Sequence, residues 1–364
     1  MIGVEVTRFR SFATLVLAVL SCLVLLNGCS GTAAPAKSDQ VSGKQETPSS
    51  AKSEAPDTAK PSEKTTSSGE KYPARPIDFI VPWGPGGGAD QLARKLSPLT
   101  EKILGAAMPV INVAGATGAT GAAKMLASPA DGYTILVFTA DALTSIAMGG
   151  TPYTHKDFDS IIRGMARASF FFVNTDSPYK TWQDLEKAAK LQPGKVSVAT
   201  AGEGSSDDLT VAYFAAKDVK MSSVPYPKPG ERYAALLGGH ADVLYEQAGD
   251  VRQFLTSGQI RPVIAFNEKR VKGFDNVPTS KELEYDILLP QFGTVVARKG
   301  TDPSKIKALG DAFKKAMDTP DWASFAEEQL MMEDTYMNPE TVTKFLESEY
   351  NILVNLGKEV GLRK

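Results

Sequence analysis

Cysteine, histidine and excess positive charge are all scarce in this sequence, and each scarcity excludes a class of function. Two of the 364 residues are cysteines, Cys22 and Cys29, and two are histidines, His155 and His240. Thiol chemistry and cysteine-ligated metal sites are therefore excluded from the body of the chain, and a metal site would need oxygen ligands alone. Lysine and arginine number 40 against 42 acidic residues, a balance that argues against a nucleic-acid binder.

Sequence signatures of catalysis are missing as well. His155 in "YTHKDF" and His240 in "GGHAD" lie in expected loops, and neither belongs to a His-Glu-x-x-His pattern. A serine triad needs a histidine, and no G-x-S-x-G elbow is present. Asp207 and Asp208 are adjacent acids, but neighbours on a helix point in different directions. We predict a protein that is not an enzyme, with no metal and no cofactor.

The first 28 residues have the composition of an export signal. Arg8 and Arg10 precede an apolar run over 12–26, and its length of about 15 residues is short of the roughly 20 that a spanning helix needs. The segment "LNGC" that follows resembles a bacterial lipobox ending at Cys29. We expect residues 1–28 to be removed and Cys29 to carry a lipid such as palmitate. An ordinary signal peptide or a small anchor helix is the alternative.

Residues 29–71 have the composition of a solvated tether. From Ser30 to Lys71 there is no aromatic residue, and Val41 is the only large aliphatic one. Such a segment cannot bury enough apolar surface to offset the entropy lost on ordering. As a coil it has a reach of roughly 35 Å. A lipid and a tether together suit a folded body held at the extracytoplasmic face of the cell membrane.

From Tyr72 onward, expected strands and helices alternate. Apolar runs such as "IDFIV" (77–81), "YTILVFT" (133–139) and "KVSVAT" (195–200) predict buried strands. Amphipathic segments such as "TWQDLEKAAKL", which begins with a threonine suited to an N-cap, predict helices. After Arg298 the pattern is helical. This alternation predicts an α/β fold with parallel sheets and helices on both faces.

A glycine-rich loop, "PWGPGGGAD", joins the first expected strand to a helix over 90–104. In an α/β sheet, ligands bind beyond the carboxyl ends of the strands, near helix N-termini. Glycines let several backbone N–H groups converge, and the helix adds partial positive charge, so the loop suits an anion. We expect Asp90 to be the N-cap of the helix and to tie the loop to the first turn.

Two nucleotide-binding interpretations of this loop are weak. A P-loop ends in Gly-Lys-Ser/Thr, whereas Gly88 is followed by Ala89 and Asp90. The spacing Gly84-x-Gly86-x-x-Ala89 matches the dinucleotide fingerprint, but a lone match of this kind has little specificity. A tight turn without a ligand is the remaining alternative.

Two further loops rich in small residues cover 112–123 and 200–208. Close helix packing could explain the first, and helix capping could explain the second. Three such loops in one chain favour a shared anion pocket.

Several motifs resemble one family in the same order. The segments "RPIDFIVPWGPGGGADQLAR", "NVAGATGATGAAKMLASPADGYTIL", "PGKVSVATAGEGSSDDL" and "SSVPYPKPGERYAALLGGHADV" resemble the extracytoplasmic receptors of tripartite tricarboxylate transporters, the Bug-type solute-binding proteins. The resemblance runs from about Arg75 to the C-terminus. It implies a two-lobed, type II periplasmic-binding-protein fold, with two mainly parallel sheets joined by two hinge strands. Lobe 1 would comprise residues 72–174 and 291–364, and lobe 2 residues 175–290.

The resemblance also implies a function. A monomeric receptor would capture a small carboxylate, an organic acid or an amino acid, by lobe closure and hand it to a two-subunit membrane transporter. In the family the ligand is held largely by main-chain groups and bound water. The ligand-binding positions that the resemblance implies are Trp83, Gly84, Pro85, Gly86, Gly87, Gly88, Ala89, Asp90, Thr117, Gly118, Ala119, Thr139, Ala140, Thr200, Ala201, Gly202, Glu203, Ser205 and Glu246.

Some positions depart from the family pattern. Glu203 stands where the family often has a neutral amide, and Asp208 stands where a histidine is usual. If Glu203 points inward, a polyanion would be repelled, and a ligand with an ammonium group or a bound cation would fit better. If it points outward, it is a solvated acid. A sensor or scaffold lipoprotein that binds a protein partner is the alternative function.

Overall fold

The computed structural model describes residues 72–363, which contain two five-stranded sheets. The expected signal segment 1–28, the expected lipidation site Cys29 and the expected tether 29–71 lie outside the described residues. Within the described part of the chain, no helix combines the length and the apolar character that crossing a membrane requires.

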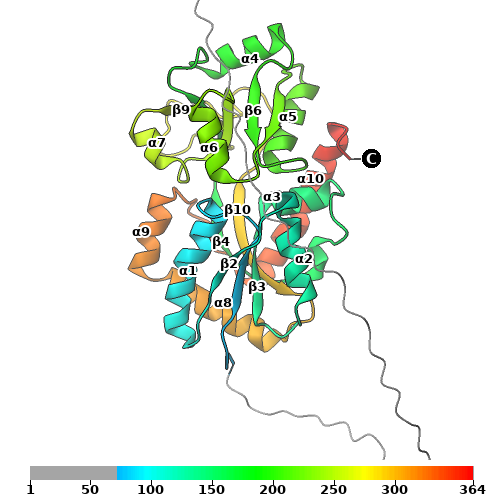
Figure 1. The fold of residues 1–364 in the computed structure, drawn as a ribbon, viewed down its shortest axis with the longest axis vertical. Coiled ribbons are helices and arrows are strands. Elements are labelled where there is room, and N and C mark those ends of the chain that lie inside the picture. Colours follow the sequence, from blue (N-terminus) through cyan, green and yellow to red (C-terminus); the bar gives the residue numbers. More distant parts are fainter. Residues whose placement is uncertain (1–71, 364) are drawn as a thin grey trace, which may run out of the picture. The chain divides into compact units, whose positions relative to one another are not determined.

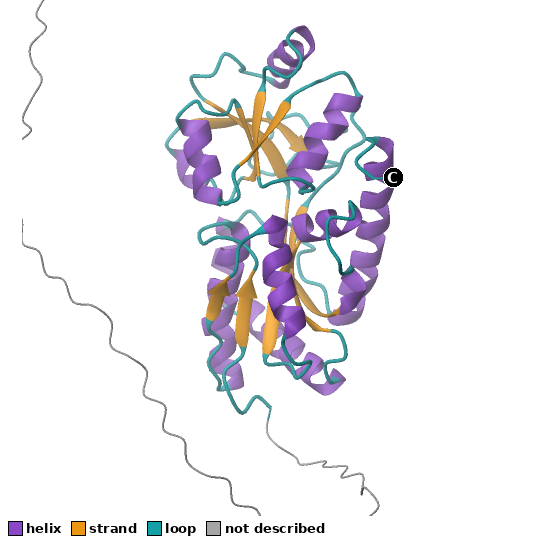
Figure 2. Ribbon diagram, turned by 45° about the vertical axis from the view of Figure 1, so that its right-hand side comes forward, coloured by secondary structure: helices purple, strands orange, loops and turns teal. Residues whose placement is uncertain are grey.

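The first sheet has the strand order β2-β1-β3-β10-β4, with helices on both faces (Figures 1 and 2). Alternate residues of β1 face opposite layers: Phe79 packs with α1 and α8, and Ile80 packs with α2, α3 and α10. The strands are β1 (Asp78–Val81), β2 (Val110–Asn112), β3 (Thr134–Thr139), β4 (Phe158–Arg167) and β10 (Gln291–Arg298). The helices are α1 (Gly88–Leu104), α2 (Ala119–Ala127), α3 (Ala140–Ala147), α8 (Pro303–Met317), α9 (Pro320–Glu328) and α10 (Pro339–Glu359), with short 3-10 turns η1 (Ala116–Gly118) and η2 (His155–Asp157).

The second sheet has the order β7-β6-β8-β5-β9. Its central strand β5 places Phe171 against Trp182 and Phe214 on one face, and places Phe170 and Phe172 in a separate core on the other. The strands are β5 (Ser169–Asn174), β6 (Ser197–Thr200), β7 (Ser222–Pro225), β8 (Val243–Gln247) and β9 (Ile260–Phe266). The helices are α4 (Trp182–Leu191), α5 (Ser206–Ala216), α6 (Pro229–Leu237) and α7 (Arg252–Thr256). We call the first sheet with its helices the first lobe, and the second sheet with its helices the second lobe.

Each sheet has four strands in one direction and one strand reversed. β10 is antiparallel to both β3 and β4, and β5 is antiparallel to both β8 and β9. The reversed strands are those that the chain enters on crossing from the other sheet. β4 runs in the common direction of the first sheet and ends at Arg167, and the reversed strand β5 of the second sheet begins at Ser169. The carboxyl ends of the parallel strands of both sheets therefore lie at this crossing and face each other. The α/β class with mainly parallel sheets is confirmed.

The crossing point differs from the expected lobe boundary at residue 174. Only Ala168 separates β4 from β5, and β5 pairs with β8 and β9 of the second sheet. Residues 169–174 therefore belong with the second sheet and not with lobe 1. The apolar runs of the two strands are nearly continuous, so the sequence does not mark the exact residue at which the chain changes sheets. The remaining bounds of the two lobes stay predictions.

Candidate functional site

A small cavity of about 60 Å³ lies where the two sheets face each other, and we call it the inner cavity. Both lobes contribute to its wall, through strand ends and helix N-termini. It is lined by Trp83, Gly87, Gly88, Ala89, Thr139, Asp141, Met165, Arg167 and Gln291 of the first lobe, and by Ala201, Asp207, Pro229, Arg232, Tyr245, Glu246, Gln247 and Asp250 of the second.

A larger cavity of about 590 Å³, the outer cavity, shares Trp83 and Ala201 with the inner one. The two cavities therefore adjoin. The outer cavity is lined by the small-residue loops that the sequence singled out, together with residues from the start of α5 and the end of α3. Its other lining residues are Gly115, Ala116, Thr117, Ser145, Met148, Gly149, Gly150, Gly202, Glu203, Gly204, Asp208, Pro227 and Leu362.

Asp90 ties the glycine loop to α1, although not as its N-cap. The helix begins at Gly88, its N-cap is Gly87, and Asp90 is the third helical residue, so the predicted capping role is wrong. The buried Asp90 carboxylate accepts hydrogen bonds from the Gly86 N–H (3.0 Å), Arg94 Nε (2.9 Å) and Asn112 Nδ2 (2.9 Å). Burial opposes ionisation, but these donors outweigh it and lower the pKa of Asp90.

Two glycines of the loop allow other groups to come very close. A Cβ atom on Gly87 would lie 2.8 Å from Cγ of Pro229, which belongs to the second lobe. A Cβ atom on Gly88 would overlap the Arg167 guanidinium and lie 3.0 Å from Asp250 Oδ2. The loop is therefore rich in glycine partly because the second lobe and a buried arginine pack directly against its backbone.

Arg167 and Asp250 form a buried ion pair between the lobes. Arg167 Nη1 lies 2.7 Å from Asp250 Oδ1, Nη2 lies 2.9 Å from Oδ2, and each side chain is 2% exposed. Gln329 Oε1 accepts a further hydrogen bond from Arg167 Nη1 at 2.7 Å, and Gln91 Nε2 donates to Asp250 Oδ1 at 3.3 Å. Gln329 Nε2 in turn donates a hydrogen bond to Gln91 Oε1 at 2.7 Å. This network connects α1, β4 and the segment after α9 to the second lobe.

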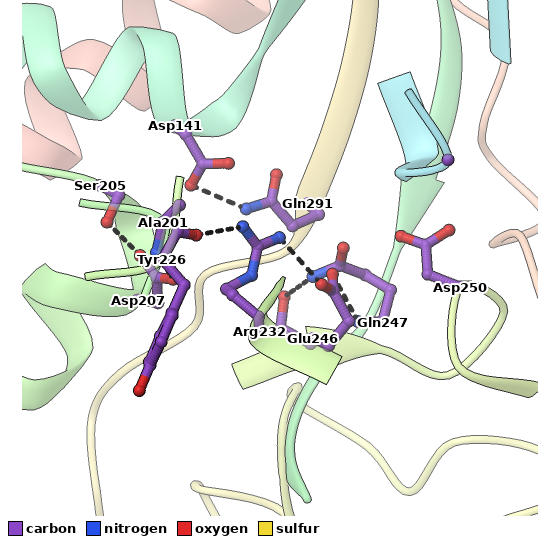
Figure 3. A network of polar contacts seen from close by, with 12 residues as sticks. Asp141, Ala201, Ser205, Asp207, Tyr226, Arg232, Glu246, Gln247, Asp250 and Gln291 are labelled. Carbon is purple, nitrogen blue, oxygen red and sulfur yellow. Dashed lines mark hydrogen bonds and ion pairs between the residues drawn. The ribbon is translucent and has the colours of Figure 1, made fainter. Parts of the chain in front are cut away.

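Arg232 and Glu246 form a second buried pair within the second lobe (Figure 3). Arg232 Nη2 lies 3.0 Å from Glu246 Oε2, and Nη1 donates to the Tyr226 carbonyl at 3.2 Å. Among the described residues, the buried Nε of Arg232 has no acceptor. Burial raises the pKa of Glu246, Arg232 opposes that rise, and the nearby Asp250 adds to it.

Asp207 lies buried in the first turn of α5. Its carboxylate accepts from the Ala201 N–H at 2.6 Å and from the Ser205 hydroxyl (Figure 3). Burial, and after it the negative charge of Asp141, raise the pKa of Asp207 to about 7. Asp141 belongs to the first lobe, and its Oδ1 accepts from the Ser206 N–H (3.1 Å) and from Gln291 Nε2 (3.0 Å). A first-lobe carboxylate therefore occupies the N-terminus of a second-lobe helix.

The inner cavity is more acidic than the sequence suggested. Four carboxylates, Asp141, Asp207, Glu246 and Asp250, face it together with two guanidiniums, Arg167 and Arg232. Among the described residues, no group of three or more His, Cys, Asp or Glu side chains is arranged to hold a metal ion.

The two cavities gather part of the predicted site. Trp83 and Ala201 line both cavities. The inner cavity also contains Gly87, Gly88, Ala89, Thr139 and Glu246, and the outer one contains Thr117, Gly202 and Glu203. The predicted residues that line neither cavity are Gly84, Pro85, Gly86, Asp90, Gly118, Ala119, Ala140, Thr200 and Ser205. Contact of any of these residues with a ligand stays a prediction.

Glu203 is exposed on the wall of the outer cavity. Its carbonyl accepts a hydrogen bond from Thr117 Oγ1 at 3.1 Å, which joins the two lobes. Glu203 does not line the inner cavity, whereas Asp207 and Glu246 do. The question whether an inward carboxylate repels a polyanionic ligand therefore applies more strongly to these two residues.

Sequence reasoning missed most of the charged side chains in the inner cavity. A signal existed for Arg167, which is a charged residue between two apolar runs, and for Asp250, which follows the carboxyl end of β8 by three residues. The sequence contains no such signal for Arg232, because an arginine in the first turns of an amphipathic helix is usually solvated.

The chain matches a family model described as "Tripartite tricarboxylate transporter family receptor" over residues 92–362. It is similar to the UPF0065 protein in the gbd 5' region of Cupriavidus necator, with 34% identity over 300 residues that cover 79% of this chain and 89% of that protein. It is also similar to a TctC solute-binding protein from Polaromonas, with 29% identity, a TM-score of 0.61, and 79% and 99% of the two chains covered.

A second solved structure, MatC from Rhodopseudomonas palustris with bound malate, shares the fold. It has 20% identity and a TM-score of 0.72 over 78% of this chain and 99% of that one. Together with the two facing sheets, these likenesses confirm the periplasmic-binding-protein fold that the sequence predicted.

Proposed function

This chain belongs to the tripartite tricarboxylate transporter receptor family, whose members are solute-binding receptors and not enzymes, and on that premise we propose that it captures a small carboxylate by closure of its two lobes. We propose further that it delivers the ligand to a two-subunit membrane transporter. The expected transport role rests on membership of the family, and the expected capture rests on the site.

One observation carries the proposal: two adjoining cavities lie between the lobes, at the carboxyl ends of strands in both sheets. This is the position at which open α/β sheets bind ligands. The outer cavity, about 590 Å³, falls within the range of small-molecule sites, which is roughly 300–1,000 Å³. Malate bound to MatC is a carboxylate of suitable size.

Contacts between the lobes support the proposal that ligand binding favours closure. Asp141 accepts from the Ser206 N–H, and the hydroxyls of Thr144 and Ser206 lie 3.1 Å apart. A ligand shifts an equilibrium between open and closed states only by its difference in affinity for them. A carboxylate held by the loops over 115–118 and 202–204 would contact both lobes only when they are closed.

Binding is tested by thermal unfolding and isothermal titration with a panel of mono-, di- and tricarboxylates and amino acids. A ligand specific to the folded state raises the melting temperature saturably. The recovered ligand should be chemically unchanged after incubation. If no member of the panel gives a saturable shift, the proposed function fails.

Transport is tested by uptake of the identified ligand in cells that lack this chain. Uptake should fall on deletion and return when the chain is restored. Ligand binding without any effect on uptake would instead support a sensor that acts through a protein partner.

Lipid anchoring at the extracytoplasmic face forms a separate part of the proposal. The lipobox-like segment ending at Cys29 and the polar composition of residues 30–71 support it. Wild-type protein should fractionate with membranes and partition into detergent, whereas Cys29→Ala should do neither. Equal membrane association of both proteins would contradict an anchor at Cys29.

A further inference from the structure

We infer that the inner cavity receives an ammonium group, so that the ligand is an amino carboxylate and not a simple dicarboxylate. This inference rests on the proposed function, namely capture of a small carboxylate between the lobes. It concerns which carboxylates the site accepts.

The guanidiniums of the inner cavity are already matched by acids of the protein. Arg167 holds Asp250 through two hydrogen bonds of 2.7 and 2.9 Å, and Arg232 holds Glu246 at 3.0 Å. To pair with either guanidinium, a ligand carboxylate would have to displace a buried protein carboxylate. Breaking a buried pair leaves an uncompensated charge, which is strongly unfavourable.

Backbone donors in the first turn of α5 and in the loop before it are matched in the same way. Asp141 accepts from the Ser206 N–H at 3.1 Å, and Asp207 accepts from the Ala201 N–H at 2.6 Å. A helix N-terminus commonly binds an anion, but here protein carboxylates already fill that role. The N-terminus of α5 is therefore occupied by protein carboxylates, whereas that of α1, whose N-cap makes no side-chain hydrogen bond, is open to a ligand carboxylate.

The lining is also unbalanced in charge. Four carboxylates line the cavity against two guanidiniums. Because the pKa of Asp207 is about 7, this excess of acidic groups is only partly ionised near neutral pH, but it still repels a dianion and attracts a cation. Burial, and after it the negative charge of Asp141, raises the pKa of Asp207, so a further negative charge is disfavoured here.

Two arginine donors in the cavity wall still lack acceptors. Arg167 and Arg232 are each at least nine-tenths buried, and the Nε of each has no partner among the described residues. A ligand with both an ammonium group and oxygen acceptors satisfies the acids and these donors together. The inner cavity, about 60 Å³, accommodates such a compact head group, and the adjoining outer cavity, about 590 Å³, accommodates the rest of the molecule.

The test compares ligands that differ only in the ammonium group: aspartate with succinate, glutamate with glutarate, and 2-aminoadipate with adipate. Isothermal titration at pH 7.5 should show at least about tenfold tighter binding by the amino member of the matching pair. If the dicarboxylate binds as tightly or more tightly, the proposed function stands and this inference is overturned. If no pair shows binding by either member, both are overturned.

Two variants test whether Asp207 causes the preference for the ligand with the ammonium group. Asp207→Asn removes one cavity carboxylate and should shrink the preference for the amino member about tenfold. Asp218→Asn is the matched control, because Asp218 is exposed, lines neither cavity, and has φ 62°, which asparagine tolerates. A folded Asp207→Asn protein that keeps the full preference would overturn the inference. The ligand pairs on the unmodified protein decide the matter if that variant does not fold.

Discussion

The guanidinium of Arg167 fills the space in which a side chain on Gly88 would begin. A Cβ atom at residue 88 would overlap Arg167 Nη2 and approach Asp250 Oδ2 to 3.0 Å. The first residue of α1 is therefore a glycine for reasons of packing, and the buried ion pair between the lobes depends on it. The same loop that the sequence suggested for an anion thus also accommodates a protein cation.

Gly88→Ala should destabilise the protein by about 1–3 kcal/mol, because the methyl group must push the guanidinium or its partner aside. Urea unfolding measures the change. Gly230→Ala on α6 is the control, since no atom lies within 4 Å of a Cβ there and its φ is not positive. That control should leave stability unchanged or raise it by up to about 1 kcal/mol. Equal stability of Gly88→Ala and wild type would contradict the packing argument.

Arg167→Gln should cost about 3–5 kcal/mol, because it leaves Asp250 buried and without its cation. The double variant Arg167→Gln/Asp250→Asn should lose less than the sum of the two single changes, since no charge is then unpaired. Lys307→Ala provides the exposed comparison. Its pair with Asp311 is solvated, so the change should stay within about 0.5 kcal/mol. Additive single effects in denaturant unfolding would argue against coupling between Arg167 and Asp250.

Much of the fold followed from local pattern. The apolar runs at 77–81 and 133–139 became β1 and β3, and Thr181 became the N-cap of α4 with Asp184 as its capping-box partner. These features depend on residues close together in the sequence. The expected lobe boundary at residue 174 lies six residues beyond the crossing at Ala168, because no turn residue marks where the chain changes sheets. A strand that changes sheets is determined by which partners pair with it, and those lie far along the chain.

The site was predictable mainly in its loops, although Trp83 and Glu246 were also among the predicted residues. Glycine-rich loops after strands pointed to the cleft, since strand ends and helix N-termini converge there in any α/β sheet. The charged pairs were not predictable in the same way, because Arg167 and Asp250 are 83 residues apart. Which acid meets which base depends on how the two sheets face each other.

Gly87→Ala should weaken ligand binding about tenfold or more, because its Cβ would lie 2.8 Å from Pro229 Cγ and would obstruct closure. Pro229→Ala removes Cγ, and the residual contact to Cβ, at 3.5 Å, is ordinary packing. The double variant should therefore regain most of the affinity. Alanine is compatible with the start of α6, where Pro229 is the first residue. Isothermal titration of the three variants checks this, and failure of the rescue would mean that Gly87 acts through the ligand itself.

Asp207 should make stability fall as pH rises. Its pKa is about 7 in the folded protein against 3.8 as the ordinary value, so between about pH 4 and 7 the folded state holds a proton that the unfolded state has released. The stability contributed by this proton is fully present below pH 4 and is lost as the pH rises through 7. Asp207→Asn lacks this dependence. Unfolding measured from pH 4 to 8 should therefore show a steeper decline for wild type than for the variant.

The protonation of Asp207 on ligand binding should reveal whether the ligand carries an ammonium group. An ammonium group beside Asp207 would lower its pKa, so binding would release a proton and tighten as the pH rises from 6 to 8. A simple dicarboxylate would raise that pKa further, so binding would take up a proton and weaken over the same range. Titration at pH 7 in two buffers of different ionisation enthalpy gives the sign directly. Proton uptake with the tightest ligand would contradict an ammonium group in the inner cavity, whereas release that disappears in Asp207→Asn would assign it to this carboxylate.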